Sequence, residues 1–283
     1  MANKNTVATL LKMKAEGQKV SQVTCYDYST ARRGNDAGIN TILVGDSLGM
    51  TMQGYATTLP VTMDEMIVYG RSVVRGAQDV FVIMDMPFMS YQVSVEQAVA
   101  NAGRLIKETN ANAIKLEGGA AVCEQIKAIV DSGIPVCAHI GMTPQSVNAF
   151  GGFKVQGKGE ENARRVLEDA LKVQEAGAFM CVLECVPPKL AALITKKVDM
   201  ITIGIGAGAG CDGQVLVMQD MLGITSDFTP KFVKKFAEIG EEMTAAFKAY
   251  DEEVKAGSFP TLAHSFVKSD SSDEFLEQLD AEY

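Results

Sequence analysis

The sequence is short of positive charge and of long apolar runs. It has 26 Lys and Arg residues against 35 Asp and Glu, which gives a formal net charge of −9. Nucleic-acid binding needs clustered Lys and Arg against phosphates, so this balance argues against a nucleic-acid partner. Nowhere do about eighteen apolar residues run together, and residues 1–11 hold no long apolar segment. We therefore expect neither a membrane span nor a secretory signal.

Paired cysteines and histidines are also scarce. The six cysteines lie mostly inside apolar runs and lack C-x-x-C spacing, so neither a zinc site nor a disulfide framework is indicated. Buried free thiols are typical of a reducing compartment, and we predict a cytoplasmic protein. Only two histidines occur. His139 ends an apolar run, whereas His264 lies near the C-terminus without such a context.

Short apolar runs instead alternate with amphipathic segments along most of the chain. The eight strand candidates are residues 20–24, 42–44, 81–84, 113–116, 135–140, 179–183, 201–205 and 213–217. Strands that alternate with helices are joined in parallel by right-handed crossovers. Eight such strands in 283 residues predict an α/β fold of the (β/α)8 TIM-barrel class. An open doubly wound sheet is the alternative.

The chain changes character near its C-terminus. We predict that residues 1–266 form a single barrel catalytic domain with peripheral N- and C-terminal helices, and that residues 267–283 form a polar acidic tail. Residues 231–256 have helical period and many charges, so we expect them to pack outside the barrel or against a neighbouring molecule. The connections 46–60 and 141–159 are too long for tight turns, which favours a functional role for both.

Acidic residues follow several of the apolar runs. Asp46, Asp85 and Glu117 end three successive runs, and Glu184 ends a later one. One acid at a strand end is more often a turn former or a helix cap, but three in series indicate another role. A barrel gathers its strand ends at one rim, and hard divalent cations bind sets of carboxylate oxygens. The sequence therefore predicts a cation site at this rim.

Two further polar residues share the same strand ends. Lys115 lies two positions before Glu117, so both point to one side of a strand. It is either a neutralising partner for a buried carboxylate or a ligand for an anionic substrate. His139 is either a hydrogen-bonded structural residue or a member of the same rim. The glycine-rich segment 204–210 lacks full G-x-G-x-x-G spacing, which favours a phosphate contact or close packing over a dinucleotide site.

Short motifs in fixed order resemble the ketopantoate hydroxymethyltransferase family. The resemblance extends to about Phe266. It rests on TCYDY (24–28), VGDSLGM (44–50), TLPVT (58–62), DMPF (85–88), KLEGG (115–119), HIGMTPQ (139–145), ECVP (184–187), GIGAG (204–208) and DGQ (212–214).

The resemblance implies a Mg²⁺-dependent barrel enzyme. Such an enzyme transfers a hydroxymethyl group from 5,10-methylenetetrahydrofolate to 3-methyl-2-oxobutanoate through an enolate. The product is 2-dehydropantoate (ketopantoate), on the route to pantothenate and coenzyme A. Bacterial members are large homo-oligomers, which implies a decamer here. The partners expected are thus a small 2-oxo acid and a folate.

The resemblance also implies roles for individual residues. Asp46, Asp85 and Glu117 match the metal-site positions. The residues that match oxo-acid-binding positions, or lie near that substrate, are Asp46, Ser47, Asp85, Lys115 and His139. Glu184 matches the catalytic base, and we predict that it is not a metal ligand. The folate pocket is expected between residues 50–60 and 141–159.

Two other functions remain open at this point. A metal-dependent C–C lyase or phosphonomutase on the same barrel would act on an oxo acid through a similar enolate. Such enzymes commonly use a nucleophilic Cys or a phosphate pocket, whereas the cysteines here are expected to be buried. A sensor or scaffold that only binds an oxo acid is the alternative outside the enzymes. It predicts ligand binding without proton abstraction.

Overall fold

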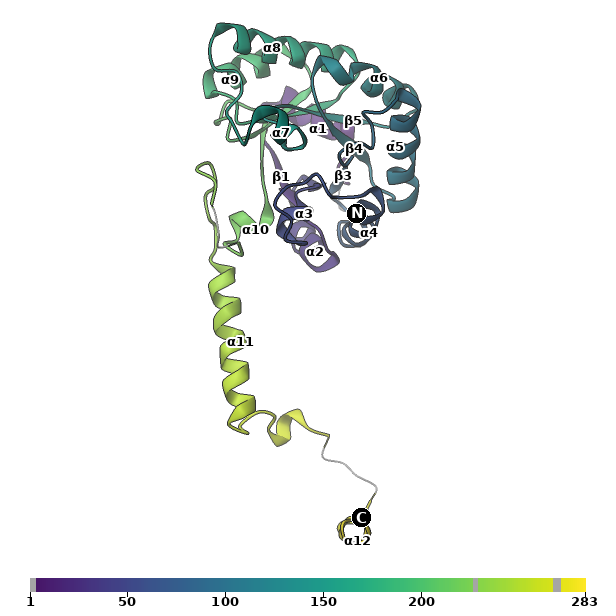
Figure 1. Ribbon diagram of the computed structural model, residues 1–283, viewed down its shortest axis with the longest axis vertical. Coiled ribbons are helices and arrows are strands. Elements are labelled where there is room, and N and C mark those ends of the chain that lie inside the picture. Colours follow the sequence, from purple (N-terminus) through teal and green to yellow (C-terminus); the bar gives the residue numbers. More distant parts are fainter. Residues whose placement is uncertain (1–3, 226–228, 267–270) are drawn as a thin grey trace.

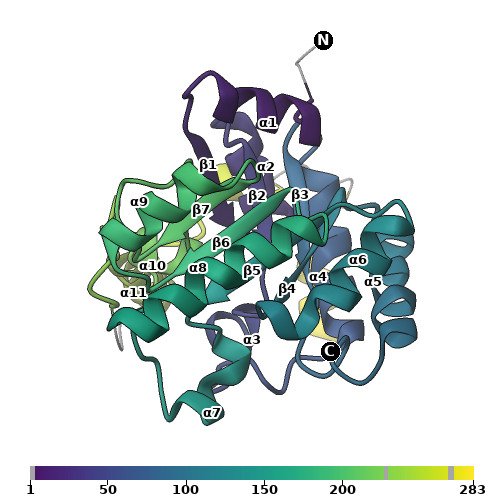
Figure 2. The same cartoon turned by 90° about the horizontal axis from the view of Figure 1, so that it is seen from above.

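A closed barrel of eight parallel strands forms the body of the molecule (Figures 1 and 2). The computed structural model describes residues 4–225, 229–266 and 271–283. The strands are β1 (Val20–Thr24), β2 (Thr41–Val44), β3 (Phe81–Asp85), β4 (Ala113–Glu117), β5 (Val136–Gly141), β6 (Met180–Glu184), β7 (Ile201–Ile205) and β8 (Gly213–Leu216). Each pairs with the next, and β1 pairs with β8. The predicted (β/α)8 fold is confirmed, and the open sheet is excluded.

Helices connect the strands and cover the outside of the barrel (Figure 2). The α-helices up to β8 are α1 (Val7–Ala15), α2 (Tyr28–Asp36), α3 (Leu48–Thr51), α4 (Met63–Gly76), α5 (Val95–Thr109), α6 (Cys123–Asp131), α7 (Val147–Phe150), α8 (Glu160–Glu175) and α9 (Pro188–Lys197). Those that follow are α10 (Met218–Met221), α11 (Ile239–Lys255) and α12 (Asp273–Glu282). The short 3₁₀ turns are η1 (Ala120–Val122), η2 (Pro144–Ser146) and η3 (Leu262–His264). Within the described residues, no helix is both long and apolar enough to cross a membrane.

Alternate residues of each strand face two different cores. In β3, Phe81 and Ile83 belong to the cluster inside the barrel, whereas Val82 and Met84 belong to the cluster beneath the helices. Side chains alternate with a period of two along a strand. The same alternation places the polar residues of the strand ends on the inner face. These residues are Asp85, Lys115, Glu117, His139 and Glu184.

Helix α1 closes the N-terminal end of the barrel. Leu10 is fully buried in the inner cluster. The Lys14 ammonium donates to the carbonyls of Val198 and Met200 at 2.9 and 2.6 Å and to Asp212 Oδ2 at 2.9 Å. These contacts join α1 to the segments that enter β7 and β8. The polar residues therefore lie at the opposite, carboxyl-terminal end.

Strand β8 is short and begins with a glycine, a residue that weakens the interior of a strand. Gly213 pairs with Val20 where the barrel closes. A Cβ at this position would collide with the Val20 carbonyl oxygen. Close backbone approach thus requires glycine here, and the residue that weakens the strand pattern is the one that allows closure.

The C-terminal segment differs from its prediction. Helix α11 begins at Ile239, well after residue 231, and none of its residues is buried. It projects away from the barrel (Figure 1). The expectation that it packs outside the barrel is therefore wrong, because its apolar residues contact no barrel surface that buries them. The alternative, that it packs against a neighbouring molecule, stays a prediction. In the tail, residues 273–282 form α12, and residues 267–270 lie outside the described residues.

Candidate active site

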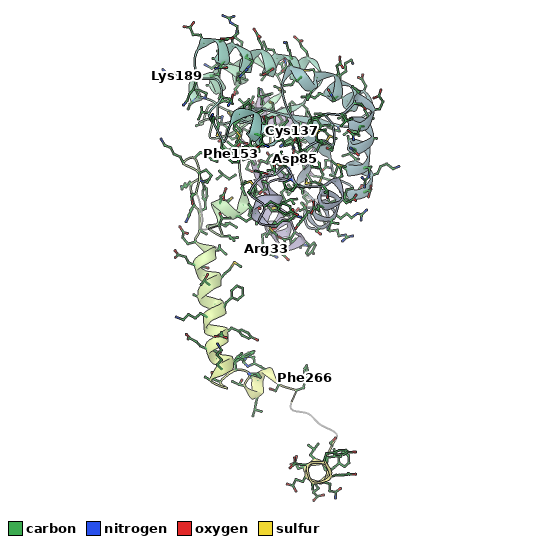
Figure 3. All side chains as sticks on the ribbon, in the orientation of Figure 1. Arg33, Asp85, Cys137, Phe153, Lys189 and Phe266 are labelled. Atoms are coloured by element: carbon green, nitrogen blue, oxygen red, sulfur yellow. The ribbon has the colours of Figure 1, made fainter. Side chains whose placement is uncertain are left out.

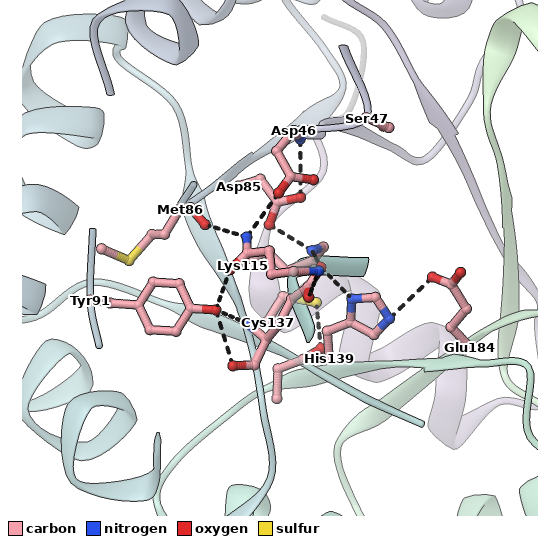
Figure 4. A network of polar contacts seen from close by, with 12 residues as sticks. Asp46, Ser47, Asp85, Met86, Tyr91, Lys115, Cys137, His139 and Glu184 are labelled. Atoms are coloured by element: carbon pink, nitrogen blue, oxygen red, sulfur yellow. Dashed lines mark hydrogen bonds and ion pairs between the residues drawn. The ribbon is translucent and has the colours of Figure 1, made fainter. Parts of the chain in front are cut away.

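Polar side chains from successive strands meet at the carboxyl-terminal end of the barrel (Figure 4). The Asp46 main-chain N–H donates to Asp85 Oδ2 at 3.3 Å. The Lys115 ammonium donates to Asp85 Oδ1 at 2.6 Å and lies 3.9 Å from Glu117 Oε1. All four residues are at most 5% exposed. The structure therefore brings the three predicted metal-site residues together around one lysine.

His139 links this cluster to Glu184. Its Nδ1 lies 3.4 Å from Glu117 Oε1, and its Nε2 lies 3.2 Å from Glu184 Oε2. Both are ion-pair contacts without the alignment of a regular hydrogen bond. The Glu184 side chain is 13% exposed, against 3% for Glu117. Glu184 is therefore the acid that opens most toward the mouth of the site.

A glycine at the end of β5 allows the end of this strand to lie close to Glu184 at the end of β6. Gly141 has φ of +91°, a left-handed conformation that favours glycine. A Cβ on Gly141 would collide with the Glu184 carbonyl oxygen. The β5 and β6 ends can lie this close only because residue 141 lacks a side chain.

Ser47 points elsewhere. Its hydroxyl lies 2.8 Å from the Tyr26 hydroxyl, and either can be the donor. Figure 4 shows its side chain directed away from the acid cluster. The structure thus puts Ser47 beside Asp46 in the chain but does not join its hydroxyl to the acids. Its predicted role in holding the oxo acid stays a prediction.

Burial and neighbouring charges determine the pKa values of the acids in the site. Burial raises the pKa of Asp46 well above its usual value, and the carboxylates of Asp85 and Glu117 raise it further. Burial also raises the pKa of Asp85, although Lys115 opposes this shift. Burial opposes ionisation of Glu117 too, but His139 and Lys115 outweigh it and lower the pKa of Glu117. Burial and the neighbouring acids therefore favour the protonated form of Asp46.

The two cationic side chains are held in their charged forms. Burial disfavours the Lys115 ammonium, but Asp85 and Glu117 outweigh it and raise the pKa of Lys115. Burial and Lys115 both disfavour the charged His139, yet Glu117 and Glu184 raise its pKa to about 9. The acids are thus the reason that both groups stay protonated at neutral pH.

The donor set of the site fits a hard cation with few protein ligands. In the described parts of the chain, no three His, Cys, Asp or Glu side chains stand in an arrangement ready for a metal. Mg²⁺ is a hard cation that commonly takes one or two carboxylates together with water and substrate oxygens. The carboxylates of Asp46, Asp85 and Glu117 offer oxygen ligands of this type.

The site also contains two residues that were not predicted as site residues, Tyr91 and Gln145. The Gln145 side chain donates from Nε2 to Asp46 Oδ2 at 2.8 Å, and its main-chain N–H donates to Glu117 Oε2 at 2.9 Å. The Tyr91 hydroxyl lies 2.7 Å from Gln145 Oε1. Gln145 belongs to the motif HIGMTPQ, which was the signal that could have drawn attention to it.

A cavity of about 450 Å³ opens between the connection after β2 and the loop after β3. It is lined by the end of the connection after β2, the loop after β3, and helices α4 and α5. The lining residues are Leu59, Pro60, Val61, Thr62, Met63, Pro87, Phe88, Met89, Ser90, Gln97 and Asn101. The connection 141–159 contributes none of them, so this cavity matches only one of the two segments expected to frame a folate pocket.

Solved structures with a similar fold are enzymes that act on small acids. A phosphonopyruvate hydrolase in complex with oxalate and Mg²⁺ has a TM-score of 0.60 and 10% identity, covering 98% of this chain and 95% of that chain. A 2,3-dimethylmalate lyase of the PEP mutase/isocitrate lyase superfamily has a TM-score of 0.59 and 15% identity, with coverage of 98% and 95%. At this identity the likeness shows the fold alone. Fold and site together define a TIM-barrel protein with its polar cluster at the carboxyl-terminal rim.

Sequence comparisons give the family. A family model described as ketopantoate hydroxymethyltransferase matches residues 4–262. A 3-methyl-2-oxobutanoate hydroxymethyltransferase of Clostridium novyi is 64% identical over 268 residues, covering 95% of this chain and 98% of the relative. One of Enterococcus faecalis is 60% identical, with coverage of 98% and 99%. The chain belongs to the ketopantoate hydroxymethyltransferase family and is an enzyme.

Proposed function

We propose that this enzyme transfers a hydroxymethyl group from 5,10-methylenetetrahydrofolate to 3-methyl-2-oxobutanoate and forms ketopantoate. The names of the relatives support the acceptor. In the balanced reaction, the acceptor loses the proton at C3, and its C3 carbon forms a bond to the folate methylene as one methylene–nitrogen bond breaks. Water then replaces the second nitrogen, so the water oxygen becomes the product hydroxyl and tetrahydrofolate leaves with both nitrogens protonated. The single observation that carries the proposal is the chain of contacts from Asp46 to Glu184 at one rim of the barrel.

Glu184 is proposed as the base that removes the C3 proton. Its side chain opens toward the mouth of the site and contacts His139 within the cluster. Because the His139 imidazole stands between Glu184 and Glu117, it separates the base from the proposed metal-site acids. Glu184 is therefore free to face the substrate carbon, in keeping with a base that is not a metal ligand.

Asp46, Asp85 and Glu117 are the residues that would hold Mg²⁺. When bound, the cation would draw electron density from the keto oxygen and stabilise negative charge as the C3 proton leaves. Lys115 contacts Asp85 and remains charged, so it offsets part of the charge that the acids and the substrate carboxylate bring together. Ser47 and His139 are proposed to contact the oxo acid at the edges of this cluster.

Two features of the wider protein support further parts of the proposal. All six cysteines are unpaired, which supports a reducing cytoplasmic setting. The large exposed side chains of α11 and its flanks support a homo-oligomer, for which a decamer is the state expected from the family. A lyase or phosphonomutase activity has only the fold likeness in its favour, and at 10–15% identity this likeness does not extend to chemistry.

The proposal is tested by exchange of the C3 proton for deuterium. NMR follows 3-methyl-2-oxobutanoate in D₂O with the enzyme and Mg²⁺ but without folate. Wild type is expected to introduce deuterium at C3, and Glu184→Gln is expected to lose this exchange by a factor of about 10² or more while substrate binding persists. Glu161→Gln, an exposed acid in the first turn of α8, is the matched control and should exchange like wild type.

Each negative result has a separate meaning. Exchange that continues in Glu184→Gln would remove Glu184 from the role of base. An absence of exchange in wild type would rule out enolisation before folate binds. Binding of the oxo acid without either exchange or product, even with folate present, would favour the sensor or scaffold.

A further inference from the structure

Gln145 contacts two of the acids of the site at once. It lies in the turn η2 that follows β5 and is 5% exposed. Its Nε2 donates to Asp46 Oδ2 at 2.8 Å and to the Met86 carbonyl oxygen at 2.9 Å. Its main-chain N–H donates to Glu117 Oε2 at 2.9 Å. Gln145, which follows β5, thus hydrogen-bonds to the carboxylates of Asp46 and Glu117, which lie at the ends of β2 and β4.

Tyr91 fixes the orientation of the Gln145 amide. Its hydroxyl lies 2.7 Å from Gln145 Oε1 and accepts the main-chain N–H of Glu117 at 3.1 Å. The phenol proton has two acceptors within reach, Gln145 Oε1 at 2.7 Å and the Glu117 carbonyl oxygen at 3.1 Å, and the shorter contact is the one to the amide oxygen. If the amide were turned over, its oxygen would face the Met86 carbonyl oxygen, an acceptor that has no proton to share. The network admits one orientation of the amide.

The contacts use one oxygen of each carboxylate and leave the other. Gln145 occupies Oδ2 of Asp46 and Oε2 of Glu117. Oε1 of Glu117 faces Lys115 and His139, and the contact with Gln145 does not use Oδ1 of Asp46. The side-chain amide of Gln145 orients Asp46, and its main-chain N–H orients Glu117. Because both groups are neutral, they do not cancel the charge that a cation needs. A lysine in place of Gln145 would hold the acids equally well but would neutralise them.

We propose that Gln145, held by Tyr91, is a positioning residue that presets the Asp46 and Glu117 carboxylates for a divalent cation. The inference rests on the proposed function, because it assumes that these acids bind Mg²⁺. Groups that hydrogen-bond to metal-ligating side chains typically contribute about 10- to 100-fold to metal affinity. Without the side-chain amide, Asp46 Oδ2 loses its hydrogen-bond partner. Binding a cation must then also fix the orientation of the Asp46 carboxylate, which lowers the affinity. The loss is thus expected in metal affinity before it is seen in turnover.

The test measures Mn²⁺ binding to the full-length protein by the EPR signal of free Mn²⁺, with and without 3-methyl-2-oxobutanoate. Gln145→Met keeps the size of the side chain and the main-chain N–H but removes every contact of the side-chain amide. It is expected to weaken Mn²⁺ binding about 10- to 100-fold. Tyr91→Phe removes only the hydroxyl and is expected to weaken binding by less. This second variant keeps the test open if Gln145→Met does not fold.

Gln22→Met is the matched control. Gln22 is also a buried glutamine, 6% exposed, but its amide donates to Thr41 Oγ1 at 3.0 Å and touches no acid of the site. A merely structural role predicts that Gln22→Met and Gln145→Met lose stability and keep Mn²⁺ affinity. The inference predicts that thermal unfolding in EDTA changes for both, whereas the Mn²⁺ dissociation constant changes only for Gln145→Met and Tyr91→Phe.

The outcomes separate this inference from the proposed function. If wild type binds Mn²⁺ and exchanges the C3 proton, but Gln145→Met and Tyr91→Phe bind Mn²⁺ within about twofold of wild type, the positioning role is overturned and the proposed function stands. If wild type binds no Mn²⁺ with or without the oxo acid, both are overturned. Weaker binding in the two variants, with an unchanged control, supports the positioning role.

Discussion

Lys115 is the residue on which the balance of the site depends. It is 3% exposed and provides the only lysine contact to Asp85 and Glu117 among the ion pairs of the described residues. Charges buried in a protein interior are tolerated when they are paired and costly when they are not. The cluster has more acids than cations, so removing a cation and removing an acid are not equivalent changes.

Lys115→Met is therefore expected to cost far more stability than Asp85→Asn. Removing the ammonium leaves buried acids unpaired and should lower the free energy of unfolding by about 3–5 kcal/mol. Asp85→Asn removes one of the acids that raise the pKa of Asp46, which offsets part of its own loss. Urea unfolding in EDTA at pH 7 and constant protein concentration measures both variants.

A surface lysine provides the comparison for Lys115→Met. Lys127 pairs with Asp131 at 3.0 Å, but both side chains are more than half exposed. Lys127→Met is expected to cost at most about 1 kcal/mol, because water screens the pair. Equal losses for Lys115→Met and Asp85→Asn would mean that the surplus of negative charge does not govern this cluster.

At the scale of the element, strands β2 to β7 could be predicted because each is a short, mostly apolar run buried on both faces. In β3 the sequence FVIMD places apolar residues on both sides and the acid at the end. The inner face of Asp85 follows from the period of two alone. Topology then brings strand ends together whatever their separation in sequence. This is why residues as distant as Asp46 and Glu184 could be assigned to one rim.

The residues that escaped prediction lie in loops. Tyr91 follows β3 and Gln145 follows β5, and neither position has a period that fixes its direction. Their contacts depend on how two connections fold over the barrel, which is tertiary information. Residues 231–238, which precede α11, were predicted as part of a helix because charges and apolar residues recur there. Helix α11 begins only at Ile239. A local pattern does not record whether a surface exists to pack against.

Hydrogen bonds join the first turn of helix α4 to the connection after β2. Thr62 and Glu65 form a capping box, with the Thr62 N–H donating to Glu65 Oε2 at 2.7 Å. The Gln53 amide donates to Glu65 Oε1 at 2.7 Å. Both oxygens of one carboxylate are thus in use, one for the cap and one for the connection 46–60.

Glu65→Gln is expected to destabilise the protein in a manner that depends on pH. The hydrogen bond from the Thr62 backbone lowers the pKa of Glu65. A carboxyl with a lowered folded-state pKa contributes stability above its unfolded pKa, about 4.5, and loses it as the pH falls through the folded-state value. The variant has one acceptor oxygen and no charge. Its stability deficit should therefore be present at pH 7 and shrink below about pH 4.5.

Urea unfolding of wild type and Glu65→Gln across this pH range measures the deficit. Glu161→Gln controls for the loss of one surface carboxylate in the first turn of another helix. A deficit of constant size from pH 7 downward would show that the charge of Glu65 contributes nothing and that only the shape of its side chain matters.

At the scale of the whole molecule, the residues of the candidate site all come from one barrel, whereas the helix of the C-terminal arm buries none of its residues. The arm is α11 with its flanking residues. On α11, Met243, Phe247, Tyr250 and Val254 are 43%, 67%, 60% and 45% exposed. Their spacing of four, three and four residues puts them on one face of the helix. Figure 3 shows the side chains along the arm standing clear of the barrel.

A stripe of this kind on an isolated chain favours burial against another surface. A second copy of the chain is the occupant that the proposed homo-oligomer requires. The double variant Phe247→Glu/Tyr250→Glu places two charges in the stripe, and burying them unpaired would be costly. It is therefore expected to reduce the assembly to smaller species. Ala245→Glu adds a charge on the opposite face of the same helix and should leave the assembly unchanged.

Size-exclusion chromatography with light scattering gives the mass in each case as a multiple of the 30.3 kDa chain. The double variant should fall below wild type, and Ala245→Glu should match it. Because the residues from Asp46 to Glu184 all come from one barrel, the smaller species should still exchange the C3 proton of the oxo acid. A wild type that is already a monomer, or a double variant of unchanged mass, would contradict the role of the stripe. Loss of exchange on dissociation would mean instead that a neighbouring copy completes the site.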